Sequence, residues 1–502
     1  MVLDDGTLIG EVDVVKHDLL MIQEKFKSMV LDINFDKCEL FTMSDDSNDE
    51  IQAINEIFPG ITVVQDKDLT LLGAPLTINA VKAVFEKKIN ELELLFSRLD
   101  ILNKHVAYFL LKHCFGIPKL TYLLRTTPIW KFPEIVKRID SSLKEAIEKI
   151  CSVQLRDFQH SLCSLPCRMG GIGIRKIEDI MLPAFLSSVN STSSLINSIL
   201  SVTTTDLVEV VYYEEGIEIW KSMNETTPIN AVNDNSPINA MTSQRKWDDI
   251  NISRIISSFN FPSDKHIAIF KASLKPESSL WLSTLPSKNI GTLLDDNTFR
   301  ISMALRLGAK MCHEYNCVCG TLVDEYGRHG LCCKKSPGRF FRHKVMNGTI
   351  HRTLQSANVP ATLEPLGLFR DDGKRLDGMT LIPWKRNSCM VWDATCVDTL
   401  AASYINKTKI KAGSAAEKAA LKKHNLYKAV KERNYMLIPF AVETLGPWGK
   451  EALQFTDELG KMLIAITGEV RAKEFFKKKY KFSNSTRQCS KYYGFIRYES
   501  QT

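Results

Sequence analysis

The hydrophobic residues of the chain follow two different spacings. From Val81 to about Val189 they recur every three or four positions, as in Phe85, Ile89, Leu92 and Phe96, which predicts helices with one buried face. Beyond position 346, short apolar runs bounded by Gly, Pro and Asp alternate with such helical stretches, which indicates strands between helices. The expected order is helix, three strands, helix, strand, in the ranges 346–359, 363–368, 378–382, 390–397, 414–433 and 436–443.

Polar sequence separates these two parts. Residues 187–245 are rich in Ser, Thr and Asn, and residues 223–244 have little hydrophobic pattern, which predicts a linker or long loop. Helical spacing then resumes near Trp247. With 502 residues, of which 44% are hydrophobic and 25% charged, the chain has the composition of a globular protein and the length of roughly two to four domains. The expected fold class is therefore multidomain α+β.

Charge is distributed unevenly along the chain. The tail from Val470 onward has nine basic and two acidic residues, which accounts for the whole net charge of +7. Aromatic residues alternate with these cations, a combination that suits the phosphates and bases of single-stranded nucleic acid. The alternative is a C-terminal helix whose aromatic residues pack on the preceding domain and whose lysines are solvated. The candidate nucleic-acid contacts are Lys477, Lys478, Lys479 and Lys481.

The thirteen cysteines are mostly scattered and odd in number, and no secretory signal precedes them, which favours free thiols in a reducing compartment. No apolar run reaches the ~18 residues that a membrane span needs. We therefore expect no membrane partner and a location in the nucleus or otherwise the cytoplasm, with the basic run 477–481 as a candidate nuclear signal.

Cysteine and histidine are concentrated between positions 312 and 333. Cys317 and Cys319 precede a short hairpin, and His329 and Cys332 follow it, which supplies the four soft ligands of a tetrahedral zinc site. Cys312 is the main substitute ligand. The alternative is a group of free thiols, or a redox pair, in a small core. The pattern favours a structural Zn²⁺.

Acidic residues lie beside strand-like runs in two regions. Asp4 and Asp5 are expected at the tip of a hairpin, and Glu364, Asp377 and Asp393 near the ends of later strands. A few carboxylates fixed in this way, with water and substrate phosphate, provide the octahedral oxygen ligands that Mg²⁺ prefers. On the alternative interpretation, the first pair forms a plain turn and the others are surface residues of turns or strand edges.

The first eighty residues resemble the second half of the palm of a reverse transcriptase. Three motifs carry this resemblance in order: the paired Asp4 and Asp5, a strand at 31–40 that bears Lys37 and follows a helical stretch at 11–29, and a Leu-Gly turn at 72–73 before a long helix. The resemblance implies a polymerase remnant with these two acids and this lysine as its site residues. Because the fingers and the palm strand with the partner carboxylate would lie upstream of Met1, polymerase activity of this chain alone is left open.

Two further stretches resemble proteins of non-LTR retrotransposons. Residues 165–174 resemble the segment that follows the thumb in their reverse transcriptases, and residues 305–465 resemble the C-terminal half of the site-specific members that bear a restriction-like endonuclease. The second resemblance rests on motifs in a fixed order: the Cys-His cluster, Glu364, Lys374-Arg375-Leu376-Asp377-Gly378, Trp392-Asp393, a helix with lysines, and Glu443-Thr444-Leu445-Gly446.

This resemblance assigns roles to individual residues. It implies that Asp377 and Asp393 bind catalytic Mg²⁺ or Mn²⁺ and that Glu364 is an accessory acid. Leu376 and Thr395 stand where the superfamily usually has Pro and Lys. In this retrotransposon group the lysine is thought to come from the helix instead, where Lys422 and Lys423 are the candidates that would stabilise developing phosphate charge or position the attacking water.

The resemblances together imply a retrotransposon-derived endonuclease. It would nick target DNA so that the new 3′ hydroxyl primes reverse transcription of an RNA template. The alternative is a nuclease-dead, domesticated nucleic-acid-binding protein that keeps only the zinc and the basic surface. The implied domains are a partial palm (1–80), a helical thumb with the following segment (81–190), a linker and helical connector (191–300), a zinc knuckle (305–345), a restriction-like endonuclease of order αβββαβ (346–468) and a basic aromatic tail (469–502).

Overall fold

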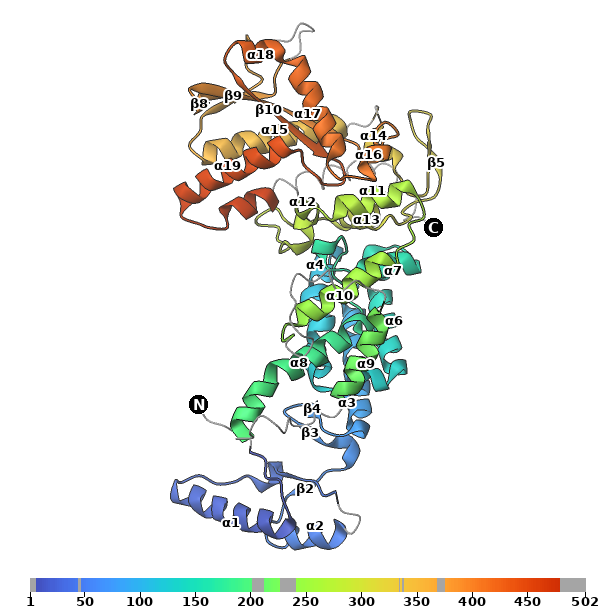
Figure 1. Cartoon of the computed structure of the whole chain (residues 1–502), viewed down its shortest axis with the longest axis vertical. Helices are drawn as coiled ribbons and strands as arrows, with labels where there is room; N and C mark the ends of the chain where they lie inside the picture. Colours follow the sequence, from blue (N-terminus) through green and yellow to red (C-terminus); the bar gives the residue numbers. More distant parts are fainter. Residues whose placement is uncertain are drawn as a thin grey trace. The chain divides into compact units, whose positions relative to one another are not determined.

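A computed structural model describes most of the chain (Figure 1), namely residues 6–43, 47–200, 212–225, 241–333, 335, 338–367 and 375–478. The protein is a mostly helical α+β protein with a small mixed four-stranded sheet and a cluster of three cysteines and one histidine. Among the described residues, no helix is both long and apolar enough to cross a membrane. The chain divides into two compact units, residues 1–90 with 126–135, and residues 91–125 with 136–502.

The first unit has little regular structure besides its helices. The expected helix at 11–29 is present as α1, but the expected strand at 31–40 is reduced to its last two residues. The chain instead forms a 3₁₀ turn at Phe35–Lys37, closed by hydrogen bonds from Lys37 N–H to Asn34 and from Cys38 N–H to Phe35. Polar Asp and Asn alternate here, and such residues favour turns over strands. The elements are α1 (Val12–Ser28), β1 (Glu39–Leu40), α2 (Ser47–Asn55), β2 (Thr62–Val63), β3 (Thr70–Leu71) and β4 (Ala74–Pro75).

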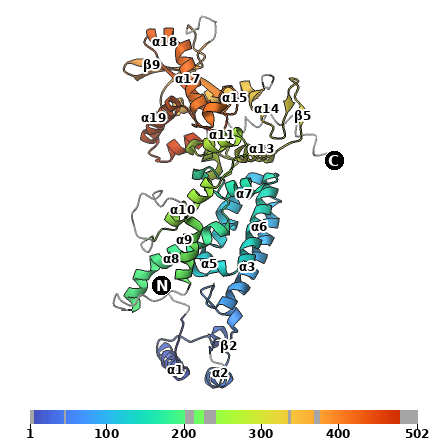
Figure 2. The same cartoon turned by 45° about the vertical axis from the view of Figure 1, so that its right-hand side comes forward.

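Helices form most of the chain from position 78 to position 307, as their apolar spacing predicts. Phe85, Ile89, Leu92 and Phe96 on α3 are all buried. Helix α8 packs against both α9 and α10 (Figure 2). Most of the expected linker at 223–244 lies outside the described residues. The helices are α3 (Ile78–Leu99), α4 (Lys104–Leu110), α5 (Thr121–Thr126), α6 (Pro133–Cys151), α7 (Asp157–Ser164), α8 (Ile177–Leu200), α9 (Tyr213–Asn224), α10 (Gln244–Ser257), α11 (Asp264–Ser273), α12 (Pro276–Ser279) and α13 (Asp296–Leu307).

The expected order of helix, three strands, helix and strand is observed in residues 338–467. Its elements are α15 (Gly338–Ser356), β7 (Ala361–Leu363), β8 (Gly378–Lys385), β9 (Ser388–Val397), α17 (Ser414–Leu426), β10 (Met436–Glu443) and α19 (Lys450–Thr467), with short helices α16 (Ile405–Thr408) and α18 (Lys428–Glu432) between them. The sheet order is β10-β9-β8-β7. Strands β9 and β10 are parallel, and the other neighbours are antiparallel.

The two faces of this sheet are covered by different helices (Figure 1). Trp392 and Phe440 pack with Ile350 of α15 and Phe455 of α19, whereas α17 covers Ala441 on the opposite face. Because successive side chains of a strand point to opposite faces, Asp393, which follows Trp392, points toward the face that α17 covers. The alternation along β9 therefore separates the core from the candidate site.

The basic tail begins as part of this domain. Residues 472–478 are helical, and Phe476 is buried in the same core as Trp392 and Phe455. Lys477 Nζ lies 2.7 Å from Asp457 and Lys478 Nζ lies 2.7 Å from Glu474. The burial of Phe476 agrees with the packed-helix alternative, whereas the two lysines contact acids of the protein and are not simply solvated. Lys479 and Lys481 lie outside the described residues.

Candidate metal centres

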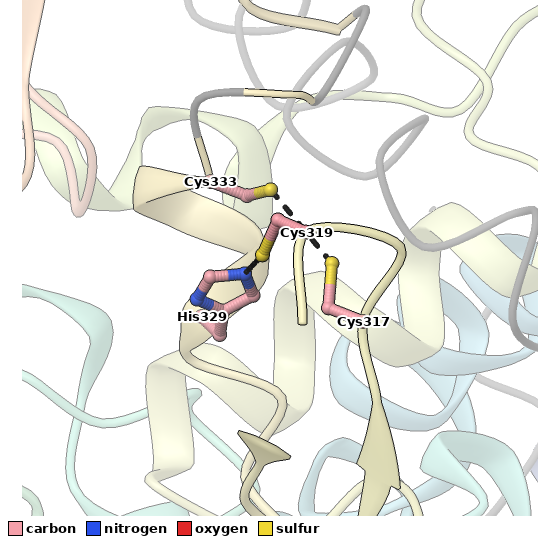
Figure 3. A group of neighbouring side chains, drawn as sticks. All are labelled: Cys317, Cys319, His329 and Cys333. Atoms are coloured by element: carbon pink, nitrogen blue, oxygen red, sulfur yellow. Dashed lines mark hydrogen bonds between the residues drawn. The ribbon is translucent and has the colours of Figure 1, made fainter. Parts of the chain in front are cut away.

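Three cysteines and one histidine converge after α13 (Figure 3). The ligand atoms of Cys317, Cys319, His329 and Cys333 all lie within 4.8 Å of one another. Cys317 Sγ and Cys333 Sγ are 3.8 Å apart, and Cys319 Sγ is 3.1 Å from His329 Nε2. Three sulfurs and one imidazole nitrogen are a common ligand set of structural zinc. The cluster could therefore bind a zinc ion.

Local backbone geometry brings the first two sulfurs together. Strands β5 (Tyr315–Asn316) and β6 (Leu322–Val323) form an antiparallel pair, and the intervening turn is closed by a hydrogen bond of 2.7 Å from Gly320 N–H to Cys317. Gly320 has a φ of +87°, a conformation that glycine adopts without strain. Hydrogen bonds with the side chain and backbone of Thr321 lower the pKa of the Cys319 thiol to about 6, which favours the thiolate form that binds metals.

The fourth ligand position belongs to Cys333 and not to the expected Cys332. Helix α14 (His329–Cys332) ends there, and Cys333 N–H donates to the carbonyl of His329. Cys333 is buried, whereas Cys332 is exposed and its Sγ contacts the His329 carbonyl at 3.5 Å. Residues four apart on a helical turn lie on one face, so the spacing from His329 could have indicated Cys333. Cys312 contacts the carbonyls of residues 324 and 325 and is not a member of the group.

A second candidate centre lies on the sheet, where Asp377 precedes β8 and Asp393 lies within β9. Gly378 pairs with Trp392, so the two acids are the next residues along this antiparallel pair. A Cβ at position 378 would lie 2.0 Å from the Trp392 ring, and only glycine permits this close approach. Asp377 Oδ2 accepts a hydrogen bond of 2.6 Å from the backbone N–H of Ala394. The structure thus brings Asp377 and Asp393 together.

Lys423 of α17 forms an ion pair with one of these acids. Its Nζ lies 2.7 Å from Asp393 Oδ1, and the Asp393 side chain is only 6% exposed. Burial raises the pKa of Asp393, the Lys423 ammonium lowers it, and the Asp377 carboxylate raises it again. Lys422 is exposed on the same helix. The sequence left the choice between these two lysines open, and the structure places only Lys423 on an acid.

Glu443 fixes the helix that carries Lys423. This buried carboxylate, at the end of β10, accepts hydrogen bonds from the backbone N–H groups of Ala415 and Ala416, at 3.0 and 3.4 Å. They are two of the first four N–H groups of α17, which have no acceptor within the helix. Glu443 therefore holds the start of α17 against the sheet.

Glu364 contacts the backbone of Asp377 through its own backbone and not through its carboxylate. It follows β7 with a φ of +48°, and its N–H donates to the Asp377 carbonyl at 3.1 Å. The side chain is exposed. The accessory role expected for its carboxylate stays a prediction.

His343 also contacts the acid pair, a contact that the sequence did not indicate. Its Nε2 lies 3.1 Å from Asp377 Oδ2, and its Nδ1 lies 3.4 Å from the side chain of Asn347, one helical turn further along α15. Asn347 Oδ1 in turn accepts a hydrogen bond from Trp392 Nε1. The hydrogen bond with Asp377 raises the pKa of His343, while burial lowers it.

The first unit offers no comparable assembly in its described residues. Lys37 is exposed at the end of the 3₁₀ turn, and Asp4 and Asp5 lie outside the described residues. The polymerase remnant stays a prediction.

Comparisons with known proteins add no assignment. No protein-family model matches this chain, and no curated protein matches it.

Proposed function

We propose that the sheet domain is a metal-dependent endonuclease that nicks DNA, in a protein derived from a non-LTR retrotransposon. One observation carries this proposal. Two acids beside each other on neighbouring inner strands, Asp377 and Asp393, come together on the face of the sheet that α17 covers, and Lys423 contacts one of them. Paired carboxylates with an adjacent cation are suited to phosphodiester hydrolysis.

The residues present fit a hard divalent cation. Both partners are carboxylates, with side-chain exposures of 13% for Asp377 and 6% for Asp393. Burial raises the pKa of Asp393, so an added cation would stabilise its charged form. Mg²⁺ and Mn²⁺ both prefer oxygen ligands. When bound, such an ion would favour ionisation of a water and neutralise negative charge on the phosphate.

The protein's own groups would orient the reaction. The Ala394 N–H and His343 hold Asp377 Oδ2 from two directions, at 2.6 and 3.1 Å. The Lys423 ammonium, 2.7 Å from Asp393, is placed to stabilise charge that develops on the phosphate or to position the attacking water. The reaction would release a 3′ hydroxyl on the nicked DNA strand, which in the family resembled here primes synthesis from an RNA template.

The Cys-His cluster would have a structural role in this enzyme. Its four candidate ligands are the number that a closed, tetrahedral structural zinc site requires. We assign no catalytic step to it. DNA and RNA are the partners that we propose, and the nuclear location stays a prediction from the basic run 477–481.

A second candidate function has an observation in its favour. Each acid of the pair already contacts a basic side chain, Asp377 with His343 and Asp393 with Lys423. If His343 is protonated, the charges balance without a metal ion. A nuclease-dead nucleic-acid-binding protein would be compatible with that arrangement.

Nicking of a supercoiled plasmid distinguishes the two functions. We expect the purified, zinc-loaded protein to convert the supercoiled form to the open circle when Mg²⁺ or Mn²⁺ is added. Asp377→Asn and Asp393→Asn should each abolish conversion while DNA binding, measured by gel shift, is kept. Asp457→Asn is the matched control, because Asp457 forms exposed ion pairs elsewhere in the domain. Binding without metal-dependent nicking by the wild type would favour the second function.

A further inference from the structure

An amine and a thiol from distant parts of the sequence meet in the helical region. Lys112 Nζ lies 3.1 Å from Cys167 Sγ. Lys112 lies on a π-helical turn, Leu111–Phe115, which continues α4, and Cys167 begins a 3₁₀ turn, Cys167–Met169, in the glycine-rich stretch 165–174. Neither the proposed nuclease site nor the zinc cluster contains either residue.

Further contacts hold both partners in place. Lys112 Nζ also donates to the carbonyl of Leu282 at 3.1 Å and lies 5.6 Å from the centre of the Tyr108 ring. The Cys167 carbonyl accepts a hydrogen bond of 2.9 Å from Ser279 Oγ. Additional contacts of both residues therefore hold the nitrogen close to the sulfur.

Gly173 provides the space for this contact. Its φ is +83°, and a Cβ at this position would lie 2.9 Å from Lys112 Cε and 3.5 Å from Cys167 Sγ. A larger residue would be strained by its backbone conformation and would push the lysine away from the sulfur. The glycine-rich stretch thus allows the contact between Lys112 and Cys167, which its sequence alone did not indicate.

The Cys167 side chain is partly exposed to solvent and lies near two basic residues. Cys167 is partly exposed, whereas Cys151 and Cys163 are buried. The guanidinium of the buried Arg306 lies 3.5 Å from the Cys167 carbonyl. Partly exposed thiols beside Lys or Arg are those that react with oxidants in proteins.

We propose that Cys167 and Lys112 form an oxidative cross-link when the protein meets hydrogen peroxide. One peroxide molecule oxidises the Cys167 thiol to a sulfenic acid and is itself reduced, and its second oxygen leaves as water. The Lys112 ammonium then loses one proton to solvent, and the free amine attacks the sulfur. An S–N bond forms and the S–O bond breaks. The hydroxyl leaves as water with a second proton from the nitrogen. The product is a sulfenamide that thiols reduce back to the free side chains.

The cross-link would join α4 to the glycine-rich stretch. Both segments belong to the same compact unit, so the bond would remove conformational freedom from the unfolded chain, as a disulfide does. We expect the oxidised protein to unfold at a higher temperature than the reduced protein and to lose this increase when a thiol reductant is added.

Peptide mass spectrometry of the zinc-loaded full chain tests the proposal. After peroxide treatment we expect a linked pair of peptides, one with Lys112 and one with Cys167, whose mass is the sum of the two less two hydrogens. A thiol reductant should separate them. Oxidation of Cys167 to sulfinic acid without a linked pair would overturn the proposal, and a linked pair that retains the oxygen would overturn the condensation step.

Variants separate the specific pair from general oxidation. Lys112→Arg keeps the positive charge but should abolish the linked peptides, as should Cys167→Ser. Lys119→Arg and Cys114→Ser are the matched controls, since Lys119 pairs with Glu91 and Cys114 is exposed, and both should still give the link. Equal cross-linking in Lys112→Arg would contradict the assignment of the nitrogen.

Discussion

The two candidate metal centres differ in how their ligands are arranged. In the Cys-His cluster, the sulfurs and the imidazole contact one another, 3.8 Å between Cys317 and Cys333 and 3.1 Å between Cys319 and His329. On the sheet, each acid instead contacts a basic residue, Lys423 or His343. The first centre offers four ligands to one ion, whereas the second offers two acids, each beside a cationic or basic group. A closed set of ligands suits a structural ion, and an open set suits a reaction.

Loss of a cluster cysteine should have the largest effect on folding. Cys317→Ser or Cys333→Ser should abolish zinc binding, which in small zinc domains contributes on the order of 10 kcal/mol to folding. We expect residues 312–333 to lose protection from hydrogen exchange, and a chelator should do the same to the wild type. Cys332→Ser is the matched control and should keep its zinc. Zinc loss in Cys332→Ser with retention in Cys333→Ser would contradict the assignment of the fourth ligand.

Loss of an acid should have the largest effect on activity and little effect on folding. Asp377→Asn keeps an oxygen for the Ala394 N–H, so its unfolding temperature should stay close to that of the wild type. Plasmid nicking should fall by about 10³-fold, the loss expected when a main electrostatic group of an active site is removed. Rates measured with Mg²⁺ over a range of protein concentrations give this value. Unchanged zinc content in the same sample would show that the two centres are independent.

The two neighbouring lysines should differ clearly. Lys423→Met removes the ammonium from Asp393 and should lower the nicking rate by about 10²-fold. Lys422→Met changes an exposed side chain of the same helix and should change the rate less than twofold, which is within about 0.5 kcal/mol. Single-turnover rates with excess enzyme separate this effect from DNA affinity. Equal losses in both variants would indicate a general effect of positive charge on DNA binding.

Substitution of His343 should have a smaller effect on the nicking rate than substitution of an acid or of Lys423. It contacts Asp377 and is held by Asn347, so we expect it to orient the carboxylate. Groups that orient metal ligands typically contribute 10–100-fold to affinity or activity, and the side chain of His343 is 47% exposed, so His343→Gln should lower the rate by about tenfold. A higher metal concentration should restore part of the rate, because weaker metal affinity is the cause. No rescue by metal would argue for a different role.

The sequence predicted elements better than side-chain partners. The order of strands and helices between 338 and 467 follows from apolar spacing, because one buried face repeats with the period of its element. The roles of Lys423 and Cys333 depend on which neighbour faces the site, and a helix turns by about 100° per residue. A one-residue choice therefore needs the packed structure. The contact of His343 with Asp377 joins α15 to β8, and no local pattern encodes it.

In the first unit, by contrast, the prediction of one element was wrong. The resemblance to a palm predicts a strand from Leu31 to Leu40, but the alternating Asp32, Asn34 and Asp36 form turns more readily than strands. A short motif can thus resemble that of a family while the segment that carries it takes another local structure. The helix α1, which has a longer periodic pattern, was predicted correctly.

Anomalous scattering from a crystal grown with zinc and soaked in Mn²⁺ locates both ions in one experiment. We expect a zinc peak among Cys317, Cys319, His329 and Cys333, and a manganese peak between the carboxylates of Asp377 and Asp393. A zinc peak alone, with His343 and Lys423 still on the two acids, would contradict the proposed nuclease.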